Sequence, residues 1–254
     1  MRINNHAVAS YRTLYTAPYS AHVIRLLPQV LIMSPPEFPF NGLVTQHTVL
    51  RIATRSNAAA LLNYYAINRN HLRRWEPLRS NEFYTHDSID KRLSQMEQQM
   101  AIGNALHLLL YPSHAGFPVS PPAANEMSAV SGLDDPDDSG AMGIFTPHTS
   151  KLIGECNFTN IIRGPFQACH LGFSISAQFE GKGLMCEALA AAIDYIFCEY
   201  KLHRIMANYC PENRRSGRLL TRLGFEREGL ARAYLKINGF WADHVLTSLI
   251  NPVQ

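Results

Sequence analysis

The chain has 254 residues, of which 46% are hydrophobic and 17% are charged. This is enough apolar material for one medium-sized domain with a real core, and it excludes a chain that is disordered throughout. The 23 basic and 20 acidic residues leave a net charge of only +3, so the overall charge does not indicate a nucleic-acid-binding or membrane-surface protein.

The cysteines and the hydropathy pattern bear on the compartment. Five cysteines lie 12 to 17 residues apart with no Cys-x-x-Cys pair, which favours neither a zinc site nor a disulfide framework. No window contains the roughly 18 uninterrupted apolar residues that a bilayer span needs. We therefore expect a protein of the reducing cytoplasm, with no metal site and no membrane contact.

The first 43 residues have a composition of their own. No acidic residue precedes Glu37, whereas Arg2, Arg12 and Arg25 are scattered among Ser, Thr and Tyr, a composition shared with organelle transit peptides. The alternative is a poorly ordered extension that is unrelated to targeting. We predict an N-terminal extension over residues 1–43 and one folded domain over residues 44–254.

The first half of that domain reads as a strand, two helices and a second strand. Residues 44–54 alternate apolar and polar side chains, which predicts a strand. Helical spacing follows over residues 56–70 and again over 85–103, where Gly103 is suited to end the helix. The stretch between the helices resembles a loop, and residues 105–111 predict a buried strand.

Residues 112–142 differ from the rest of the chain. They contain five Pro, five Ser and five acidic residues but no Lys or Arg, which is typical of a mobile loop. The functional interpretation is a lid or a partner-binding arm. The alternative is an insertion that is tolerated because the entropic cost of closing a loop grows slowly with its length.

The second half predicts a mixed run of strands and helices. Asn238-Gly239 lies between the last two strands and is a strong hairpin signal. The pattern predicts strands over residues 151–161, 168–176, 204–210, 230–238 and 241–250, and helices over residues 183–200 and 212–225.

A glycine-containing turn, Gln178-x-x-Gly181-x-Gly183, joins a predicted strand to a predicted helix. Glycines let the backbone turn sharply and let an anion approach the first amides of the helix, where free N–H groups and the helix dipole favour phosphate. The turn is neither a P-loop, which needs Ser or Thr at Gly183, nor a dinucleotide fingerprint, which needs Gly at Cys186. Taken alone, the two glycines are also compatible with simple turn chemistry.

The turn follows three consecutive predicted strands, and some thirty residues after it comes a segment with an Asn and a helix that ends in Leu-Gly-Phe. In this arrangement the sequence resembles the GNAT family of acetyl-CoA-dependent N-acetyltransferases. Further matches resemble the RimJ/RimL-type branch of that family, which acetylates ribosomal proteins. They lie, in the same order, in NYYAINRNHLRRWEP, NFTNIIRGPFQACHLGFSI, GKGLMCEALAAAI, HRIMANY, NRRSGRLL, RLGFEREG and WADHVL. The resemblance spans residues 44–251 apart from the 112–142 insertion.

The resemblance implies where the co-substrate acetyl-CoA binds. It assigns the pyrophosphate to the turn formed by Gln178, Gly181, Lys182, Gly183 and Leu184. The pantetheine arm is then expected beside the preceding strand.

There the resemblance assigns the pantetheine arm to the backbone of Phe173, Ser174 and Ile175. A slot for it requires the sheet to splay between this strand and the strand at residues 204–210. Asn213 is expected to hydrogen-bond the arm.

The implied chemistry is direct attack of an amine on the thioester in a ternary complex. A backbone N–H near residues 173–175 is the expected oxyanion donor. Ser216 lies three residues after Asn213, on the same helix face, and is our candidate to protonate the departing thiolate. Many relatives use a Tyr seven residues after the Asn, but Leu220 occupies that position here.

The general base is less well defined. Some relatives carry a carboxylate just before the tyrosine of the first late strand, but Ala233 precedes Tyr234 in this chain. Glu76 is our candidate, with Glu155 and His170 as alternatives, and each also has a structural interpretation. An N-terminal α-amine needs little help, because its reference pKa of about 7.7 to 8.0 leaves on the order of a tenth of it neutral at pH 7.

Seven basic and only three acidic residues lie between Lys201 and Glu228. Such a stretch suits the coenzyme 3′-phosphate or ribosomal RNA, whereas a solvated helix face is the structural alternative.

We therefore predict a single α/β domain with a GNAT-like, mixed, centrally splayed β-sheet flanked by helices. The predicted activity is acetyl transfer from acetyl-CoA to the N-terminal α-amine of a protein, with a ribosomal protein as acceptor. This interpretation includes association with the ribosome, whereas DNA binding is not expected. Two alternatives stay open, a small-amine acetyltransferase acting on a polyamine or aminoglycoside, and a non-catalytic CoA-binding factor in ribosome assembly.

Overall fold

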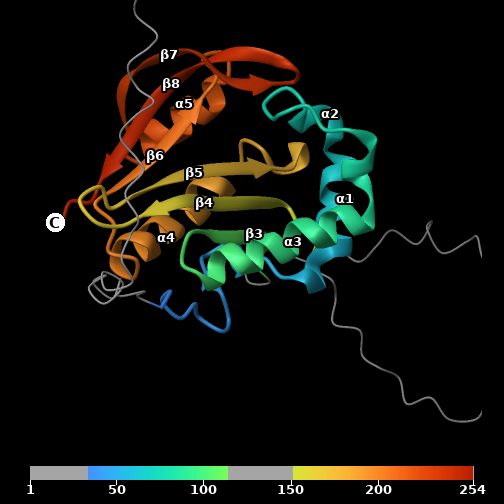
Figure 1. Cartoon of the computed structure of the whole chain (residues 1–254), viewed down its shortest axis with the longest axis horizontal. Coiled ribbons are helices and arrows are strands. Elements are labelled where there is room, and N and C mark those ends of the chain that lie inside the picture. Colours follow the sequence, from blue (N-terminus) through green and yellow to red (C-terminus); the bar gives the residue numbers. More distant parts are fainter. Residues whose placement is uncertain (1–33, 114–150, 254) are drawn as a thin grey trace, which may run out of the picture. The chain divides into compact units, whose positions relative to one another are not determined.

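The computed structural model describes residues 34–113 and 151–253. In this part of the chain, eight strands form one sheet in the order β1-β2-β3-β4-β5-β6-β8-β7 (Figure 1). The strands are β1 (Leu43–Val44), β2 (Thr48–Ile52), β3 (Leu106–Pro112), β4 (Gly154–Ile162), β5 (Ala168–Ile175), β6 (Arg204–Tyr209), β7 (Glu226–Ile237) and β8 (Phe240–Ile250). The α-helices are α1 (Ala58–Ile67), α2 (Arg69–Leu72), α3 (His86–Ala101), α4 (Leu184–Cys198) and α5 (Arg214–Arg222).

The sheet is mixed, as predicted. Strands β1 to β5 pair antiparallel in chain order, and β6 pairs antiparallel with β8, which in turn pairs with β7. Strands β5 and β6 are parallel, because α4 carries the chain back between them. The single parallel contact lies at the middle of the sheet.

This parallel contact is short, which confirms the predicted splay. It begins at Ala168↔Arg204 and ends at His170↔Met206. Beyond that point β5 stays paired with β4 up to Ile175, and β6 stays paired with β8 up to Tyr209. The two halves of the sheet therefore separate at the carboxyl ends of β5 and β6.

Alternate side chains of the strands supply two hydrophobic layers. Leu108 and Leu110 of β3 pack in the cluster that contains the buried residues of α4 and α5. Leu109 and Tyr111 pack in a second cluster with α1 and α3. The sheet thus lies between α4 and α5 on one face and α1 and α3 on the other.

Helix α3 begins and ends at residues suited to cap a helix. Thr85 begins α3 by accepting a 3.3 Å hydrogen bond from the Ser88 amide, and Ile89, Leu93 and Met96 on one face are buried. Gly103 follows the helix with φ +74°, a left-handed conformation that glycine adopts without strain.

Three local predictions need correction. The predicted strand over residues 44–54 is two antiparallel strands, β1 and β2, because the chain turns between them and the Thr45 amide donates to the Thr48 carbonyl at 2.8 Å. The short helix α2 spans the end of the predicted first helix and the start of the predicted loop, and β7 begins at Glu226 rather than at residue 230. Register shifts between Arg227 and Gly229 and between Ala231 and Leu235 interrupt the alternation of β7, so its sequence pattern hides the full length of the strand. The Asn238-Gly239 hairpin is confirmed, with positive φ at both residues.

The packed domain also extends ahead of the expected boundary at residue 44. The ring of Phe38 lies edge-on to Tyr195 of α4 with centroids 5.1 Å apart, and Leu43 pairs with Leu50. Residues 1–33 of the predicted extension, and residues 114–142 of the predicted insertion, lie outside the described residues. Within the described ranges, no helix combines the length and apolar character needed to cross a membrane.

Candidate active site

The turn between β5 and α4 requires glycine at two positions. Gly181 and Gly183 have φ angles of +74° and +80°, in the left-handed region. A Cβ atom built on either residue meets no atom within 4 Å, so the space in front of both is open. The turn therefore presents bare backbone to an incoming group, which is the cradle that a pyrophosphate requires.

Helix α4 adds a favourable electrostatic environment. Gly183 is its N-cap, and the first helical hydrogen bond runs from the Glu187 amide to the Gly183 carbonyl. The amides before Glu187 have no partner inside the helix and point toward its N-terminus, where the dipole favours an anion. The Leu184 side chain is buried, so this residue offers only its backbone. The exposed Lys182 adds a positive charge in the same turn.

The turn is fixed at its strand end. The Ser176 amide donates to the Ile153 carbonyl at 2.7 Å, and the Ala177 amide donates to Oδ1 of Asn68 at 3.2 Å. The Gln178 side chain accepts a longer, 3.4 Å hydrogen bond from Lys151 Nζ. The glycines therefore lie between an anchored strand end and a helix.

Alternation along β5 shows which backbone groups face the splay. Ser176 donates toward β4, whereas the Gln167 carbonyl accepts from His203 and Arg204 on the β6 side. Odd-numbered residues of β5 therefore direct their backbone toward β6, and these include Phe173 and Ile175. Ser174 directs its backbone toward β4 instead. Of the three predicted pantetheine residues, Phe173 and Ile175 thus have the backbone orientation that an added strand needs.

The residues predicted on the other side of the slot begin α5. Asn213 is the N-cap of this helix, and its Oδ1 accepts a 3.2 Å hydrogen bond from the Ser216 amide. Its Nδ2 group makes no hydrogen bond to another described residue, so it is available as a donor. Ser216 is half-buried, and its hydroxyl likewise makes no hydrogen bond within the described part of the chain.

An ion pair joins α5 to the glycine-containing turn. Arg215 Nη1 contacts Oε2 of Glu180, whose Oε1 lies 3.4 Å from Nε2 of His71 in α2. One carboxylate thus contacts the helix that carries Ser216 and the short helix on the other side of the site. The glycine-containing turn, the start of α5 and α2 therefore lie next to one another.

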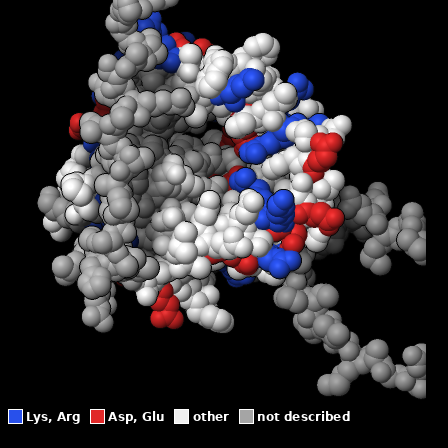
Figure 2. Space-filling model, viewed as in Figure 1, with Lys and Arg blue, Asp and Glu red and all other residues white. Residues whose placement is uncertain are grey.

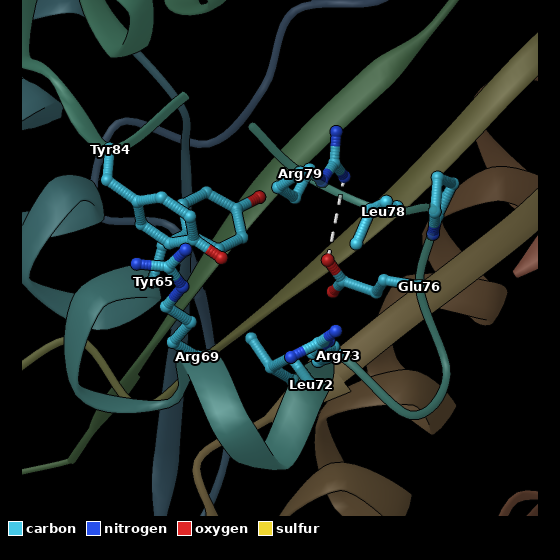
Figure 3. A pocket seen from close by; sticks show the side chains of 9 residues that line it. Tyr65, Arg69, Leu72, Arg73, Glu76, Leu78, Arg79 and Tyr84 are labelled. Atoms are coloured by element: carbon cyan, nitrogen blue, oxygen red, sulfur yellow. Dashed lines mark ion pairs between the residues drawn. The ribbon is translucent and has the colours of Figure 1, made fainter. Parts of the chain in front are cut away.

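A cavity of about 120 Å³ lies beside α2 (Figure 3). It is enclosed by aromatic, aliphatic and charged side chains from α1, α2 and the segment after α2: Tyr65, Arg69, Leu72, Arg73, Glu76, Pro77, Leu78, Arg79 and Tyr84. The β7–β8 turn is attached to this segment, because the Asn238 amide donates to the Glu76 carbonyl at 2.9 Å. The cavity is our candidate acceptor pocket.

Glu76 is the one carboxylate in the lining of this cavity. Its side chain is 20% exposed and lies 3.5 Å from Nη2 of Arg79, the ion pair drawn in Figure 3. Burial raises its pKa, and the nearby charge of Glu155 raises it further. A carboxylate with a raised pKa beside a cavity is typical of a catalytic base.

Glu155 of β4 lies close to the cavity. It is buried, its Oε1 accepts a 2.7 Å hydrogen bond from the Tyr65 hydroxyl, and its Oε2 has no partner in the described structure. Glu155 is paired in register with Ser174, whose hydroxyl lies 2.8 Å from that of Tyr64. Polar contacts therefore connect the cavity wall to β5, the strand predicted to bind the pantetheine arm.

The third candidate base, His170, is poorly placed. It is the last β5 residue paired with β6, three residues before Phe173, which is about 10 Å along an extended strand. Burial lowers its pKa, and its Nδ1 is buried with no hydrogen-bond partner in the described chain. These features favour a structural role.

The sequence did not reveal the walls of the acceptor cavity. Tyr65, Arg69 and Arg73 fell in a predicted helix and a predicted loop with no motif to mark them. The helix α2 has only four residues, so periodicity does not detect it. No group of three or more potential metal ligands occurs among the described residues.

Comparison with known proteins defines the class. Residues 47–226 match the acetyltransferase (GNAT) domain family, so this chain belongs to the GNAT acetyltransferases, enzymes that use acetyl-CoA. It is 40% identical over 210 residues to the [ribosomal protein uS5]-alanine N-acetyltransferase of Escherichia coli K12, covering 83% of this chain and 91% of that protein.

Two further comparisons agree with that class. The chain is 30% identical over 197 residues to the probable N-acetyltransferase YjcK of Bacillus subtilis, covering 78% of this chain and 90% of the relative. The crystal structure of a ribosomal-protein-S5-alanine acetyltransferase from Vibrio fischeri superposes with a TM-score of 0.65 at 35% identity, covering 82% of this chain and 96% of that one.

Proposed function

We propose that this GNAT enzyme transfers an acetyl group from acetyl-CoA to the N-terminal α-amine of a ribosomal protein. The observation that carries the proposal is the 40% identity, over 91% of its length, to an enzyme named for acetylating the alanine of ribosomal protein uS5. The splayed sheet, the glycine-containing turn and the cavity beside α2 supply the parts that such a transfer requires.

Binding of the co-substrate falls to residues at one end of the sheet. The backbone of Gly181, Gly183 and Leu184 binds the pyrophosphate, and Gln178 and Lys182 flank it. The amides of Phe173 and Ile175 face the slot, where they pair with the pantetheine and stabilise the oxyanion that forms on the acetyl carbonyl. Bound acetyl-CoA supplies the activated thioester.

Proton transfers fall to residues on either side of that slot. Glu76 accepts a proton from the α-ammonium group, which leaves the neutral amine that attacks, since the raised pKa of Glu76 brings it closer to that of an α-amine. The amine nitrogen bonds to the acetyl carbon and forms the tetrahedral oxyanion, which then collapses as the carbon–sulfur bond breaks, so no acyl-enzyme is formed. Ser216, in the N-terminal turn of α5, donates its hydroxyl proton to the departing thiolate and is reprotonated by the proton that the nitrogen loses.

The lining of the acceptor cavity opposes a polyamine substrate. Three arginines and one carboxylate surround it, and a polycation is repelled by such a site. An acidic pocket, which the small-amine alternative requires, does not occur in this cavity. The proposal extends to association with the ribosome and to the cytoplasm, where ribosomal proteins are made.

The test is to incubate the purified protein with acetyl-CoA and the ribosomal proteins of its host, and to locate any added acetyl group by fragmentation. We expect the mark on an N-terminal alanine or serine. A peptide with a blocked α-amine and a free lysine is the control and should stay unmodified. Acetylation of spermidine alone, or coenzyme binding without any transfer, would contradict the proposal and support the respective alternative.

A further inference from the structure

The acceptor cavity carries more positive than negative charge. Arg69, Arg73 and Arg79 line it, and Glu76 is its one carboxylate. Glu76 lies 3.5 Å from Arg79, so these two charges offset each other. Arg69 and Arg73 make no ion pair with any described acidic residue. Figure 2 shows basic side chains gathered around a hollow on this face of the molecule.

Neutral groups hold the guanidinium of Arg69. Its Nη2 donates to Oδ1 of Asn81 at 2.9 Å, and its Cζ lies 4.4 Å from the ring centroid of Tyr84. Figure 3 shows the guanidinium beside the rings of Tyr65 and Tyr84. Arginine has five N–H donors, so a rigidly held guanidinium with one such bond retains donors for a ligand.

Arg73 is held in a similar way from the other side. Its Nε donates to Oδ1 of Asn238 at 2.8 Å, which ties the end of α2 to the β7–β8 turn. Both terminal nitrogens of the guanidinium stay available for a bidentate contact with a carboxylate. Arg69 and Arg73 are both exposed, so an incoming chain can reach them.

These arginines lie close to the proposed site of transfer. Tyr65 lines their cavity and also donates to Glu155, which is paired in register with Ser174 on the pantetheine strand. When the α-amine of an acceptor protein reaches that strand, the residues that follow its N-terminal residue therefore lie beside Arg69 and Arg73. A cavity of about 120 Å³ suits a peptide side chain rather than a folded nucleic-acid strand.

We propose that Arg69 and Arg73 select acceptor N-termini with an aspartate or glutamate among the residues that directly follow the acetylated one. The proposal rests on the proposed function and specifies its substrate class. Each guanidinium binds a carboxylate of the acceptor, while a lysine at the same place is repelled.

The test uses three peptides that begin with alanine and differ only at their second and third residues, which are both Glu, both Gln or both Lys. We expect kcat/KM for the Glu peptide to exceed that for the Lys peptide by about tenfold or more, mainly through KM. The preference should shrink as salt is added, because the charges are exposed. Equal kcat/KM values for the three peptides would overturn the proposal.

Variants identify the residues responsible. In Arg69→Gln and Arg73→Gln the ratio of kcat/KM for the Glu peptide to kcat/KM for the Gln peptide should fall several-fold. Arg74→Gln is the matched control, because Arg74 is also exposed but packs near Trp75 and does not line the cavity. An unchanged preference in both cavity variants would contradict the assignment.

Two other outcomes have distinct meanings. If none of the three peptides is acetylated although acetyl-CoA binds, the proposed function itself fails. If a single-stranded RNA inhibits the unmodified enzyme but not Arg69→Gln, and the peptides react alike, the arginines bind RNA and the peptide proposal is wrong.

Discussion

The Tyr65 hydroxyl donates a 2.7 Å hydrogen bond to Oε1 of Glu155, joining helix α1 to strand β4 at the wall of the acceptor cavity. Burial, and then the charge of Glu155, raise the pKa of Tyr65 well above its ordinary value. The Tyr65 hydroxyl therefore stays protonated, and remains a donor, at neutral pH. The hydrogen bond from Tyr65 holds the Glu155 carboxylate inside the protein, and the charge of Glu155 contributes to the raised pKa of Glu76.

Substitution of Glu155 should move the pH profile. The negative charge of Glu155 contributes to the raised pKa of Glu76, so Glu155→Gln should lower that pKa. If Glu76 is the base, the acidic limb of the kcat/KM profile then moves to lower pH. Tyr64→Phe is the control, because it removes the hydroxyl that lies 2.8 Å from Ser174 Oγ and leaves the Glu155 charge in place. An unmoved acidic limb in Glu155→Gln would argue against Glu76 as the base.

Removal of the Glu76 charge should separate activity from stability. Burial raises the folded-state pKa of Glu76, so its contribution to stability is full below the unfolded pKa and is lost as pH rises through the folded pKa. Glu76→Gln should therefore unfold at the same temperature as the unmodified protein, or a higher one, at neutral pH. Its kcat should fall by about 10²- to 10⁴-fold. Thermal unfolding between pH 4 and 8, beside single-turnover rates, checks both parts. Full activity in this variant would move the role of base to Glu155.

The glycine-containing turn offers a matched pair of substitutions. Gly183→Ala places a side chain in the left-handed region, at a cost of about 1 to 2 kcal/mol, and puts a methyl group into the open space. Gly164→Ala carries the same strain, because Gly164 has φ +71° and open space, but it lies in the β4–β5 turn. Both variants should lose a similar amount of thermal stability. Only Gly183→Ala should raise KM for acetyl-CoA, and an equal KM in both variants would remove the turn from the coenzyme site.

The local structure of the residues proposed to bind the coenzyme could be predicted from the sequence, because it depends on local features. Two glycines between a strand and a helix, and an Asn that begins a helix thirty residues later, are each recognisable within a few residues of sequence. The φ angles of Gly181 and Gly183 and the cap made by Asn213 follow directly from those residue types. The resemblance to the GNAT family then gave a function to the spacing between the glycines and Asn213.

The acceptor half was not accessible for a physical reason. The residues that line its cavity all lie between Tyr65 and Tyr84, but the contacts that position them join distant parts of the chain. Arg73 with Asn238, and Tyr65 with Glu155, are 165 and 90 residues apart. No local propensity encodes such contacts. The β7 bulges and the four residues of α2 likewise leave no periodic signal. Among the candidate bases, the structure favours Glu76 because it lines the cavity, and it disfavours His170 because that residue lies on β5 about 10 Å before Phe173.

Asn213 allows a helix cap to be separated from coenzyme binding. Its Oδ1 caps α5 through the Ser216 amide, and Asp is an equally good N-cap. Asn213→Asp should therefore unfold at nearly the same temperature as the unmodified protein, whereas Asn213→Ala should lose about 1 kcal/mol of stability. Both variants lack the amide donors, so both should raise KM for acetyl-CoA. An unchanged KM in Asn213→Asp would limit Asn213 to capping.

Ser216 is the remaining assignment to test, and a neighbour on the same helix provides the control. Ser216→Ala removes a hydroxyl proposed to protonate the thiolate, so kcat should fall by about 10²-fold while KM for acetyl-CoA stays within a factor of two or so. Thr221→Ala removes a hydroxyl that donates a 3.0 Å hydrogen bond to the Gly217 carbonyl, and it should leave kcat unchanged. The loss in Ser216→Ala should shrink with an acetyl thioester of a more acidic thiol, because such a leaving group needs less protonation. An equal loss with both thioesters would assign Ser216 to positioning of the coenzyme rather than to proton transfer.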